Sequence, residues 1–552
     1  MATVETIDFD QVFNDIVERL KTDETRRLAK PLVRLWDGDW NFRGEVYNEI
    51  EASFQVISNE TGKGTIVLPA SYYLSRWMTD VDARAGHKNI FITVDYQGTR
   101  WSGALDELRQ EKDETGYRTV TATFLHDYEH LKHIIAYSNP FLPPEIQFPR
   151  LWIMFGPAKW ALKLTLLVNL MRLENNMWTL PDDPLKPDNP SWFDLTMSQW
   201  SQAVTPLTFE DDHSVFAIVH SRFKNMHDAS KKIVADAQLT WEPRRYLDGD
   251  PPPWPGANLR HGCLVWDLVD HSGWDEETSF GGNIFTGLIR AFTTIGSDGM
   301  TEGIDVINDP TFPAEYSQPG YLGTIPRAPG IILRDGKRTG VQTNSFKYQP
   351  ASDVGVVTGG HSMPGVNELI SASIQMAGDL IAAMIGIPPV GGAADAILKP
   401  LYTDTILAFM KWKDIGRAQD LGWSHFHETW GEGADRAYTL AALIALRTGM
   451  WRTRERTSHT VTVADGCEGL RIGQNGRGNC WLGTRIGTTV KDWGKPGRVY
   501  VDRVSELVLS YSRKDSPAFK ITIGQRPDED PILKGLEMIQ EIFSIAQELG
   551  VL

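Results

Sequence analysis

The sequence predicts an α+β multidomain protein with antiparallel β structure in its N- and C-terminal regions and a mixed, helix-rich central portion. Apolar residues alternate with a period of two over residues 31–125 and again over 457–524, which is typical of antiparallel strands. Between residues 369 and 450 the pattern becomes helical and rich in small residues. A chain of 552 residues corresponds to about three to four domains.

The N-terminal segment, residues 1–30, is predicted to be an amphipathic helix. Its apolar residues recur at helical spacing and the remaining face is charged. These apolar residues are Phe9, Val12, Phe13, Ile16, Val17 and Leu20. We expect such a helix to need a partner surface on which to pack.

Residues 31–125 predict a β-barrel-like domain. Asp37 and Gly38 mark a hairpin between two short strands, because this dipeptide is favoured in tight turns. Residues 59–64 form a second turn signal, and the following strand is stopped by Pro69. Further short strands joined by Gly-containing turns complete an antiparallel sheet or small barrel.

The rest of the chain divides into four further segments. Residues 126–256 mix helix and strand patterns, with a helix at WALKLTLLVNLMRLE, and end in the Pro-rich stretch DGDPPPWPG. Residues 257–456 form a central Gly-rich and helical portion. Residues 457–527 form a C-terminal β domain built on a hairpin, and residues 528–552 form a final helix.

That final helix is a candidate assembly interface. Its apolar residues form two adjacent stripes, which together make a face wider than a two-stranded seam. The stripes contain Ile532, Leu536, Ile539 and Phe543, and Met538, Ile542, Ile545 and Leu549. The helix either docks on its own domain or contacts another subunit.

The net charge, the cysteine content and the first residues of the chain indicate which partners and which cellular compartment to expect. A formal net charge of −16 excludes a basic, nucleic-acid-binding surface that extends over the whole chain. Three cysteines without a CxxC pair suit folding in a reducing cytoplasm. The start MATVETIDFDQVF has neither a basic nor an apolar region of an export signal.

One apolar run, residues 370–390, is long enough to be compared with a membrane span. Asp379 lies near its centre, where a charge costs about 2.5–3.5 kcal/mol in a spanning helix. We therefore interpret the run as a buried or partner-facing helix, with a late contact with the host membrane as the alternative.

The histidine motifs are weak candidates for a metal site. HDYEHLKH places His126, Glu129, His130 and His133 on helical faces, and SHFHE places His425, His427 and Glu428 in alternation. Zinc needs three or four convergent ligands, and neither motif supplies a further one. We predict structural roles for both, and no metal or cofactor.

No catalytic signature is visible. GHSMPG, residues 360–365, lacks the second glycine of a nucleophile elbow at the required position. TGKGT lacks the upstream glycine of a phosphate-binding loop. We predict that the protein is not an enzyme and has no catalytic residues.

Several segments carry a resemblance to a known family. They are VRLWDGDWNFRGEV, ASFQVISNETGKGTIVLPA, TATFLHDYEHLKHIIAYSNPFLPPEIQFP, AAMIGIPPVGGAADAILKPLYTDTILAF and RVYVDRVSELVLSYSRKDSPAFKITIG. In these phrases and in its layout, the chain resembles the hub-type minor tail proteins of long-tailed phages that infect actinobacteria.

The resemblance implies a structural part of the virion tail tip, synthesised in the host cytoplasm. It implies β-barrel-like domains at both ends of the chain and a ring of copies, usually three, that frames or closes the tail channel. The implied partners are the distal tail protein, the tape-measure protein and the receptor-binding parts, while DNA passes through the ring without stable binding. The alternatives are a tail-associated hydrolase acting on host envelope polymer and a small-molecule-binding multidomain protein.

Overall fold

A computed structural model gives the fold of the protein. The structure describes residues 9–84, 88–180 and 196–271 apart from 213, 215 and 238, the segments 293–295 and 302–304, residues 331–361 apart from 334 and 336–340, residues 408–432, and residues 445–523 apart from 447, 451, 464–469, 475–477, 479 and 494–498. The chain divides into two compact units. Unit 1 comprises Met1–Phe292, Val306–Ser345 and His459–Gln525, and unit 2 comprises Thr293–Asp305, Phe346–Ser458 and Arg526–Leu552.

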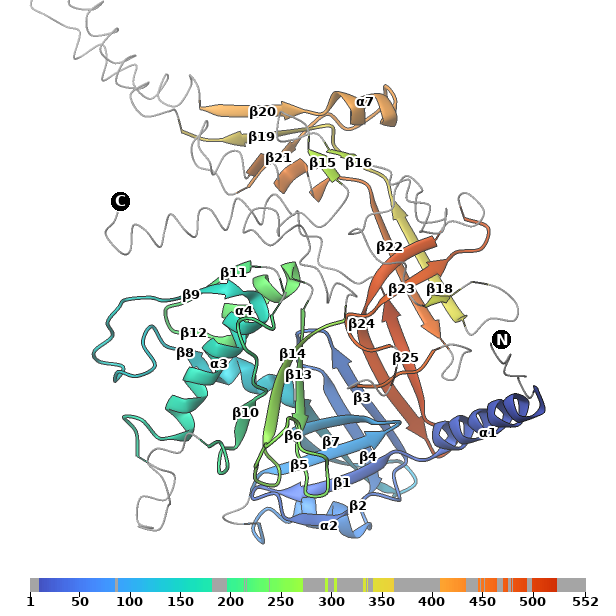
Figure 1. Ribbon diagram of the computed structural model, residues 1–552. Helices are drawn as coiled ribbons and strands as arrows, with labels where there is room; N and C mark the ends of the chain where they lie inside the picture. Colours follow the sequence, from blue (N-terminus) through green and yellow to red (C-terminus); the bar gives the residue numbers. More distant parts are fainter. Residues whose placement is uncertain are drawn as a thin grey trace, which may run out of the picture. The chain divides into compact units, whose positions relative to one another are not determined.

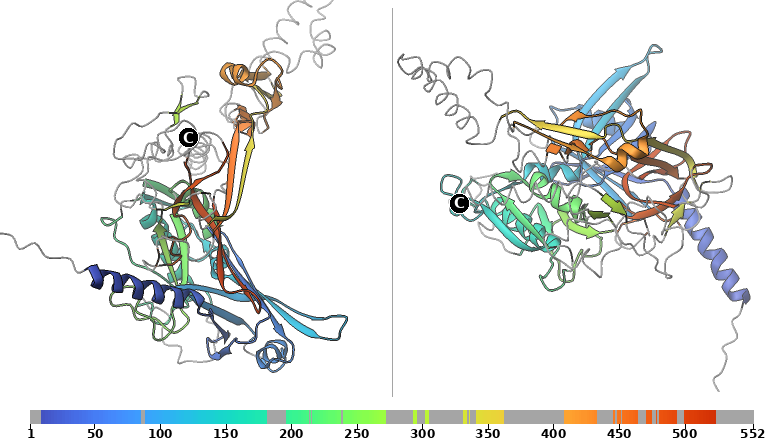
Figure 2. Two further views of the ribbon diagram at one scale, coloured as in Figure 1. Left: turned by 90° about the vertical axis from the view of Figure 1, so that its right-hand side faces the viewer. Right: turned by 90° about the horizontal axis from the view of Figure 1, so that it is seen from above.

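Unit 1 begins with helix α1, Phe9–Leu28, as the sequence predicts. Among its described side chains, only Val17 is partly buried and the others are exposed. Figure 2 shows that α1 extends away from the rest of unit 1. The expected packing surface for its apolar face is therefore not supplied by the described part of its own unit.

The main element of unit 1 is an 11-stranded sheet, with the order β17-β23-β24-β3-β4-β7-β6-β5-β1-β2 and β25 paired to β24 (Figure 1). Every pairing is antiparallel except the parallel pair β17 and β23. The strands are β1 Leu32–Asp37, β2 Phe42–Glu45, β3 Glu51–Ile57, β4 Lys63–Pro69, β5 Ile90–Tyr96, β6 Thr99–Lys112, β7 Arg118–His126, β17 Ile332–Leu333, β23 Arg485–Thr489, β24 Val499–Ser512 and β25 Ala518–Ile523.

The two ends of the chain meet in this sheet. Strand β3 buries Ala52, Phe54 and Val56 and turns the alternate residues outward, as its period-two pattern predicts. Its neighbour β24 places Leu507 opposite Val56 and Leu509 opposite Phe54, in the same apolar core. Antiparallel structure at both ends is thus confirmed. The prediction of separate barrel-like domains is corrected, because the two β regions form one curled sheet.

The hairpin of β6 and β7 reaches beyond this core. Strand β6 pairs with β5 only as far as Ala104, and no described strand pairs with its outer half on that side. Most side chains of this outer half are exposed, including Glu107, Glu111 and Lys112. Charged residues on a free edge discourage uncontrolled strand pairing. Figure 2 shows the end of this hairpin projecting from unit 1.

A second core of unit 1 is built from residues 127–270. Its elements are η1 Asp127–His133, β8 Ile135–Ala136, β9 Trp152–Pro157, α3 Ala158–Glu174, β10 Gln202–Val204, β11 Phe216–Ser221, β12 Lys224–Asn225, α4 Met226–Asp236, β13 Leu239–Arg245 and β14 Leu264–Asp270. Helix α3, predicted from the sequence, buries Leu162, Leu166 and Leu170 at spacings of four residues. Trp241 and Trp266 meet edge to face in the same core.

The HDYEHLKH segment, expected to be an α-helix, forms the 3₁₀ helix η1 instead. The physical reason is its apolar spacing. Tyr128 and Leu131 are three residues apart, and the three-residue turn directs both into the second core, where they are buried. The chain can then continue directly from β7 into this core.

Unit 2 is smaller. Its described elements are β15 Thr293–Ile295, β16 Glu302–Ile304, β19 Gly355–Gly359, β20 Phe409–Lys413, α7 Ile415–Leu421 and β21 Thr429–Trp430. Val356, Leu446 and Met450 form its core. Strands β18 Val341–Gln349 and β22 Arg456–Val463 pair with each other, and each belongs partly to both units. Residues 408–432 hold two strands and one short helix, so the helix-rich centre is not confirmed there.

Several sequence predictions fall outside the described residues. They are the final helix with Ile532, Leu536, Ile539, Ile542, Phe543, Ile545 and Leu549, the apolar run 370–390, and most of GHSMPG. Within the described residues we find no helical segment with the length and hydropathy of a membrane span.

Candidate functional site

A network of charged side chains lies between the two cores of unit 1, and Arg100 of β6 is at its centre. Its side chain is buried, and its Nε donates to Asp95 Oδ1 at 2.6 Å. Its Nη1 donates to the main-chain oxygen of Arg245 at 2.9 Å and also to the Asp250 carboxylate. The Arg100 guanidinium thus links the sheet to two residues of the second core.

Arg245, at the end of β13, makes a reciprocal contact back toward β7. Its Nε and Nη2 donate to the two oxygens of Asp127 at 2.8 and 2.9 Å, and its Nη1 donates to the Gly262 main-chain oxygen at 3.0 Å. Asp127 also accepts from the Ser102 hydroxyl. Two parallel bonds of this kind fix the orientation of both groups as well as their distance.

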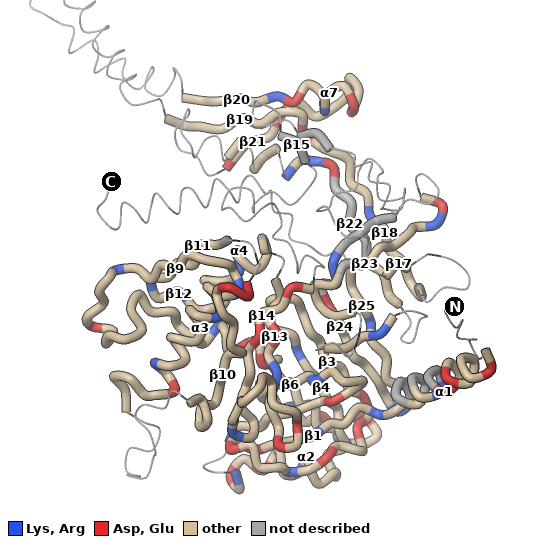
Figure 3. The backbone as a smooth tube through the Cα atoms, in the orientation of Figure 1, with Lys and Arg blue, Asp and Glu red and all other residues tan. Residues whose placement is uncertain are grey.

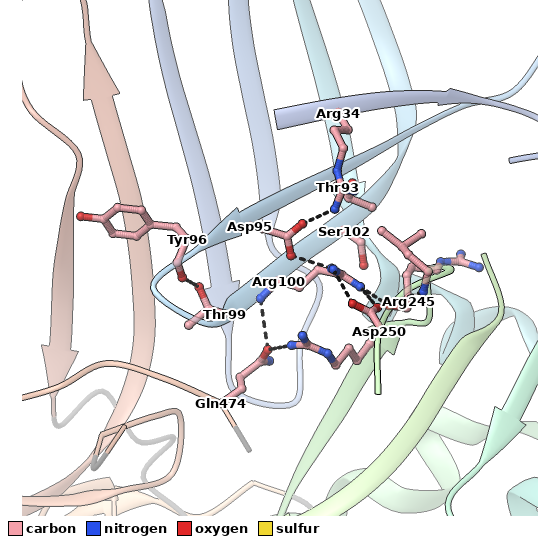
Figure 4. Close-up of polar contacts among 12 residues, drawn as sticks. Arg34, Thr93, Asp95, Tyr96, Thr99, Arg100, Ser102, Arg245, Asp250 and Gln474 are labelled. Atoms are coloured by element: carbon pink, nitrogen blue, oxygen red, sulfur yellow. Dashed lines mark hydrogen bonds and ion pairs between the residues drawn. The ribbon is translucent and has the colours of Figure 1, made fainter. Parts of the chain in front are cut away.

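The network extends to β1 and to the C-terminal part of the chain. Arg34 of β1 pairs with Asp95, the same carboxylate that binds Arg100. Gln474 Oε1 accepts from the Arg100 main-chain N–H at 3.3 Å and from Arg244 Nη1 at 3.1 Å. Figure 4 shows these groups converging from separate strands. We call Arg34, Asp95, Arg100, Asp127, Arg245, Asp250 and Gln474 the buried ionic network.

Aromatic rings cover one side of the network. The Arg245 guanidinium lies over the rings of Trp40, at 4.7 Å, and Phe91, at 5.4 Å. Trp40 and Phe91 themselves stack at 4.8 Å. Gly262 has a φ of +82°, and a Cβ at this position would lie 2.3 Å from the Trp40 ring. Glycine therefore allows the second core to approach the turn between β1 and β2.

A turn of the sheet makes a further contact with the second core. Asn59, in the turn between β3 and β4, donates to the Leu239 main-chain oxygen at 2.8 Å and accepts from the Trp241 main-chain N–H at 2.9 Å. Its φ of +53° is a conformation that asparagine tolerates better than most residues. The Asn59 side chain thus satisfies both main-chain groups of β13 at this edge.

The charges in the network are held in their ionised forms. Burial alone would raise the pKa of Asp127, but the Arg245 guanidinium and its hydrogen bonds hold that pKa far below its usual range. Burial would likewise raise the pKa of Asp250, and its hydrogen bond from Arg100 lowers it instead. Burial would lower the pKa of Arg100, but Asp250 and Asp95 raise it.

The paired guanidinium and carboxylate groups of the network are suited to a structural role. Three guanidinium groups face three carboxylates, and each carboxylate receives at least one guanidinium hydrogen bond. Acids and bases that transfer protons near neutral pH need pKa values close to that pH, whereas the pKa values of Asp127 and Asp250 are lowered further away from it. The network is therefore suited to holding two cores in one geometry.

The comparisons with known proteins agree with a structural part. Residues 32–525 match the family described as Siphovirus ReqiPepy6 Gp37-like protein. Over 576 aligned residues the chain is 38% identical to minor tail protein Gp28 of Mycobacterium phage L5, with 96% of each chain covered. The chain belongs to this family. Minor tail protein Gp28 of Mycobacterium phage D29 matches at the same identity and coverage.

The predicted resemblance to minor tail proteins of actinobacterial long-tailed phages is thus confirmed. Among solved structures, a tail protein from Neisseria meningitidis MC58 is 11% identical, with 92% of this chain and 98% of that chain covered and a TM-score of 0.36. The prophage MuSo2 43 kDa tail protein from Shewanella oneidensis is 10% identical, with coverages of 91% and 99% and a TM-score of 0.36. TM-scores this low do not establish a shared fold.

In this family member, the residues of HDYEHLKH lie where the sheet meets the second core. Glu129 accepts from the Thr61 hydroxyl of the sheet, and His130 contacts Arg245 of the second core through Nε2 at 3.0 Å. Lys132 Nζ binds Glu129 at 3.1 Å, and exposed His133 lies 3.5 Å from Glu129. The segment thus supplies side chains to the contact between the cores.

His126 ends β7, and its Nδ1 accepts from the Tyr128 main-chain N–H at 3.4 Å. Burial lowers the pKa of His126 to about 4. Within the described residues, no group of three His, Cys, Asp or Glu side chains could hold a metal ion.

The remaining candidates are separate from the network. His425 of unit 2 is partly buried and His427 is exposed, with ring centroids 5.0 Å apart, and Glu428 pairs with Lys411. Cys263 and Cys480 are buried, and burial raises the pKa of each thiol to about 12, which makes them poor nucleophiles.

Sequence reasoning missed the network itself. Arg100, Arg245 and Asp250 lie in ordinary strand and turn contexts, and Arg100 is 150 residues from Asp250. One signal was available. Arg244 and Arg245 are consecutive residues, and in a strand one of two consecutive side chains points toward the interior.

Proposed function

We propose that this protein is a structural component of the phage tail tip, where copies of it form a hub ring that frames or closes the tail channel. The observation that carries the proposal is the 38% identity, across 96% of both chains, to proteins named minor tail proteins. The buried ionic network supports it, because a ring that bears load during DNA exit needs each subunit to keep one shape.

The ring is proposed to be a homotrimer that connects the distal tail protein, the tape-measure protein and the receptor-binding parts. Two projecting elements of unit 1, α1 and the β6–β7 hairpin, carry mainly exposed side chains among those described, and we propose that neighbouring tail proteins contact them. Two-stranded ribbons are only marginally stable alone, so a hairpin of this kind is suited to making contacts within an assembly.

The negative net charge of the chain is compatible with a tail component that DNA passes without binding to it. The formal net charge is −16, and Figure 3 shows Asp and Glu interspersed with Lys and Arg along the described backbone. A wall of like charge repels phosphates over about 8–10 Å at physiological ionic strength. We propose that acidic residues line the channel. A channel lined mainly by Lys and Arg would contradict this part of the proposal.

The final helix is proposed to serve assembly. Replacing Phe543 with Asp would place a charge in the apolar face, so incorporation into tails should fail while the sheet stays folded. Gln540→Asp adds the same charge on the polar side of the helix and should assemble normally. If a chain ending at Gln525 still enters infectious particles, this part of the proposal is wrong.

The function is tested by locating the protein in purified virions with gold-labelled antibodies against unit 1. We expect label at the distal end of the tail, and particles that lack the protein should lack an intact tail tip. Label on the capsid, or absence from virions, would contradict the proposal. Soluble fragments released from host envelope polymer by the purified protein would instead support the alternative hydrolase.

A further inference from the structure

Helix α1 presents an apolar face that the described part of its own unit leaves uncovered. Over its first ten residues, from Phe9 to Glu18, only Val17 is partly buried. Phe9 is 78% exposed and Phe13 is 65% exposed. Aromatic side chains in water at neighbouring positions of one helix face mark an interaction surface.

The spacing of this face is that of a coiled-coil seam. Phe9, Phe13, Ile16 and Leu20 follow one another at intervals of four, three and four residues. These intervals correspond to alternating d and a positions of a heptad, which face a partner helix. Copies of the same helix can pack together through such a seam, because each copy supplies the same apolar side chains at equivalent levels along the bundle.

The residues beside the seam specify a parallel arrangement. In this register Val12 and Arg19 occupy g positions, and Val17 and Glu24 occupy the e positions five residues later. In a parallel pair each g residue meets the following e residue of the neighbour, so Val meets Val and Arg meets Glu.

An antiparallel arrangement is disfavoured by the same positions. Antiparallel pairing of the seam from Phe9 to Leu20 opposes g with g and e with e, so Val12 would meet Arg19 and Asp10 would meet Val17, a charged side chain against an apolar one in each case. Parallel copies instead match Val12 with Val17 and Arg19 with Glu24, so the parallel arrangement is favoured.

We propose that α1 is a self-association helix, which forms a parallel bundle with α1 of other copies of this chain. The seam ends after Leu20, because the next seam positions hold Asp23 and Arg27. The bundle thus closes over the N-terminal part of α1, and the remaining turns lead each chain to β1 of its own sheet. The inference deepens the proposed ring by naming a contact between copies, and it rests on that proposed assembly.

The test uses the purified full-length chain and its mass in solution, measured by light scattering and sedimentation. Ile16→Asp places a charge in the seam and should weaken self-association at least tenfold. Asn14→Asp adds the same charge on the opposite face and should leave the mass of the parent unchanged. Because α1 is exposed, both variants should keep the unfolding midpoint of the parent.

Orientation is tested separately. Phe9→Cys should form disulfide-linked copies on mild oxidation, because parallel helices bring position 9 of one copy to position 9 of the next. Asn14→Cys should not. Arg19→Glu should weaken association, and the double variant Arg19→Glu, Glu24→Arg should restore it.

The outcomes separate this inference from the proposed function. An Ile16→Asp chain with the mass of the parent, or a parent that is monomeric at its highest soluble concentration, overturns the inference. If such a chain is still found as a ring in virions, the proposed function stands without it. If Ile16→Asp blocks incorporation while the parent is monomeric, another tail protein is the partner of α1, and self-association is wrong.

Discussion

Replacing Asp127 with Asn tests whether the buried ionic network stabilises the place where the two cores of unit 1 meet, because Asp127 binds Arg245 of the second core and also accepts from the Ser102 hydroxyl of the sheet. Asp127 is 1% exposed and receives two Arg245 hydrogen bonds, at 2.8 and 2.9 Å. Asn has almost the same shape but no charge, and its amide group would bring N–H donors toward the Arg245 donors. The substitution therefore leaves a buried guanidinium without its counter-ion.

The expected loss follows from this burial. Breaking a buried ion pair by removing one partner typically costs about 3–5 kcal/mol, because the remaining charge stays desolvated. Equilibrium unfolding in urea, followed by the fluorescence of the 19 tryptophans, measures the loss. Adding Arg245→Met to Asp127→Asn should recover part of the stability, since the unpaired charge is then removed.

The matched control is Glu111→Gln, in the pair of Arg109 and Glu111, whose side chains are 67% and 55% exposed. We expect no change in its unfolding midpoint, because surface pairs contribute little. A loss below about 1 kcal/mol for Asp127→Asn, with a folded protein, would show that the network does not stabilise the contact.

Three further predictions concern the same contact. Burial lowers the pKa of His126 to about 4, whereas an unfolded histidine titrates near 6.5, so the free energy of unfolding should fall by about 3 kcal/mol from pH 6.5 to pH 4. Urea unfolding curves measured at a series of pH values test this, and His126→Gln should reduce the dependence on pH in that range. Gly262→Ala should perturb the near-ultraviolet dichroism of Trp40 and destabilise more than Gly249→Ala, which also has a positive φ but nothing within 4 Å of its Cβ. Asn59→Ala should leave two main-chain groups of β13 unpaired and lower the free energy of unfolding by about 1–3 kcal/mol in urea titrations, and a loss near zero would mean that water replaces the side chain.

Local patterns predicted local structure well. The turn at Asp37 and Gly38 connects β1 and β2, and the C-terminal hairpin forms β24 and β25, because alternation and turn residues act over a few positions. Helix α1, Phe9–Leu28, lies within the segment 1–30 that was predicted to be helical. The family resemblance was also carried by short phrases of sequence.

Long-range pairing was not predictable in this way. Gln55 of β3 and Glu506 of β24 are 451 residues apart and hydrogen bonded, and periodicity says nothing about which strands become neighbours. For the same reason Arg100 and Asp250 could not be assigned as partners. The 3₁₀ form of η1 was missed because the expectation rested on polar residues four apart, His126 with His130 and Glu129 with His133, and not on the spacing of three between the apolar residues of the segment.

The central claim is that copies of this protein form a ring around the channel of the phage tail tip. A cryo-electron microscopy reconstruction of the virion tail tests it most directly. We expect unit 1 to fit a closed ring of copies at the distal end of the tail, with the helices α1 parallel to one another. A protein present as a single copy away from the tail axis, or density for unit 1 outside the tail, would contradict the account.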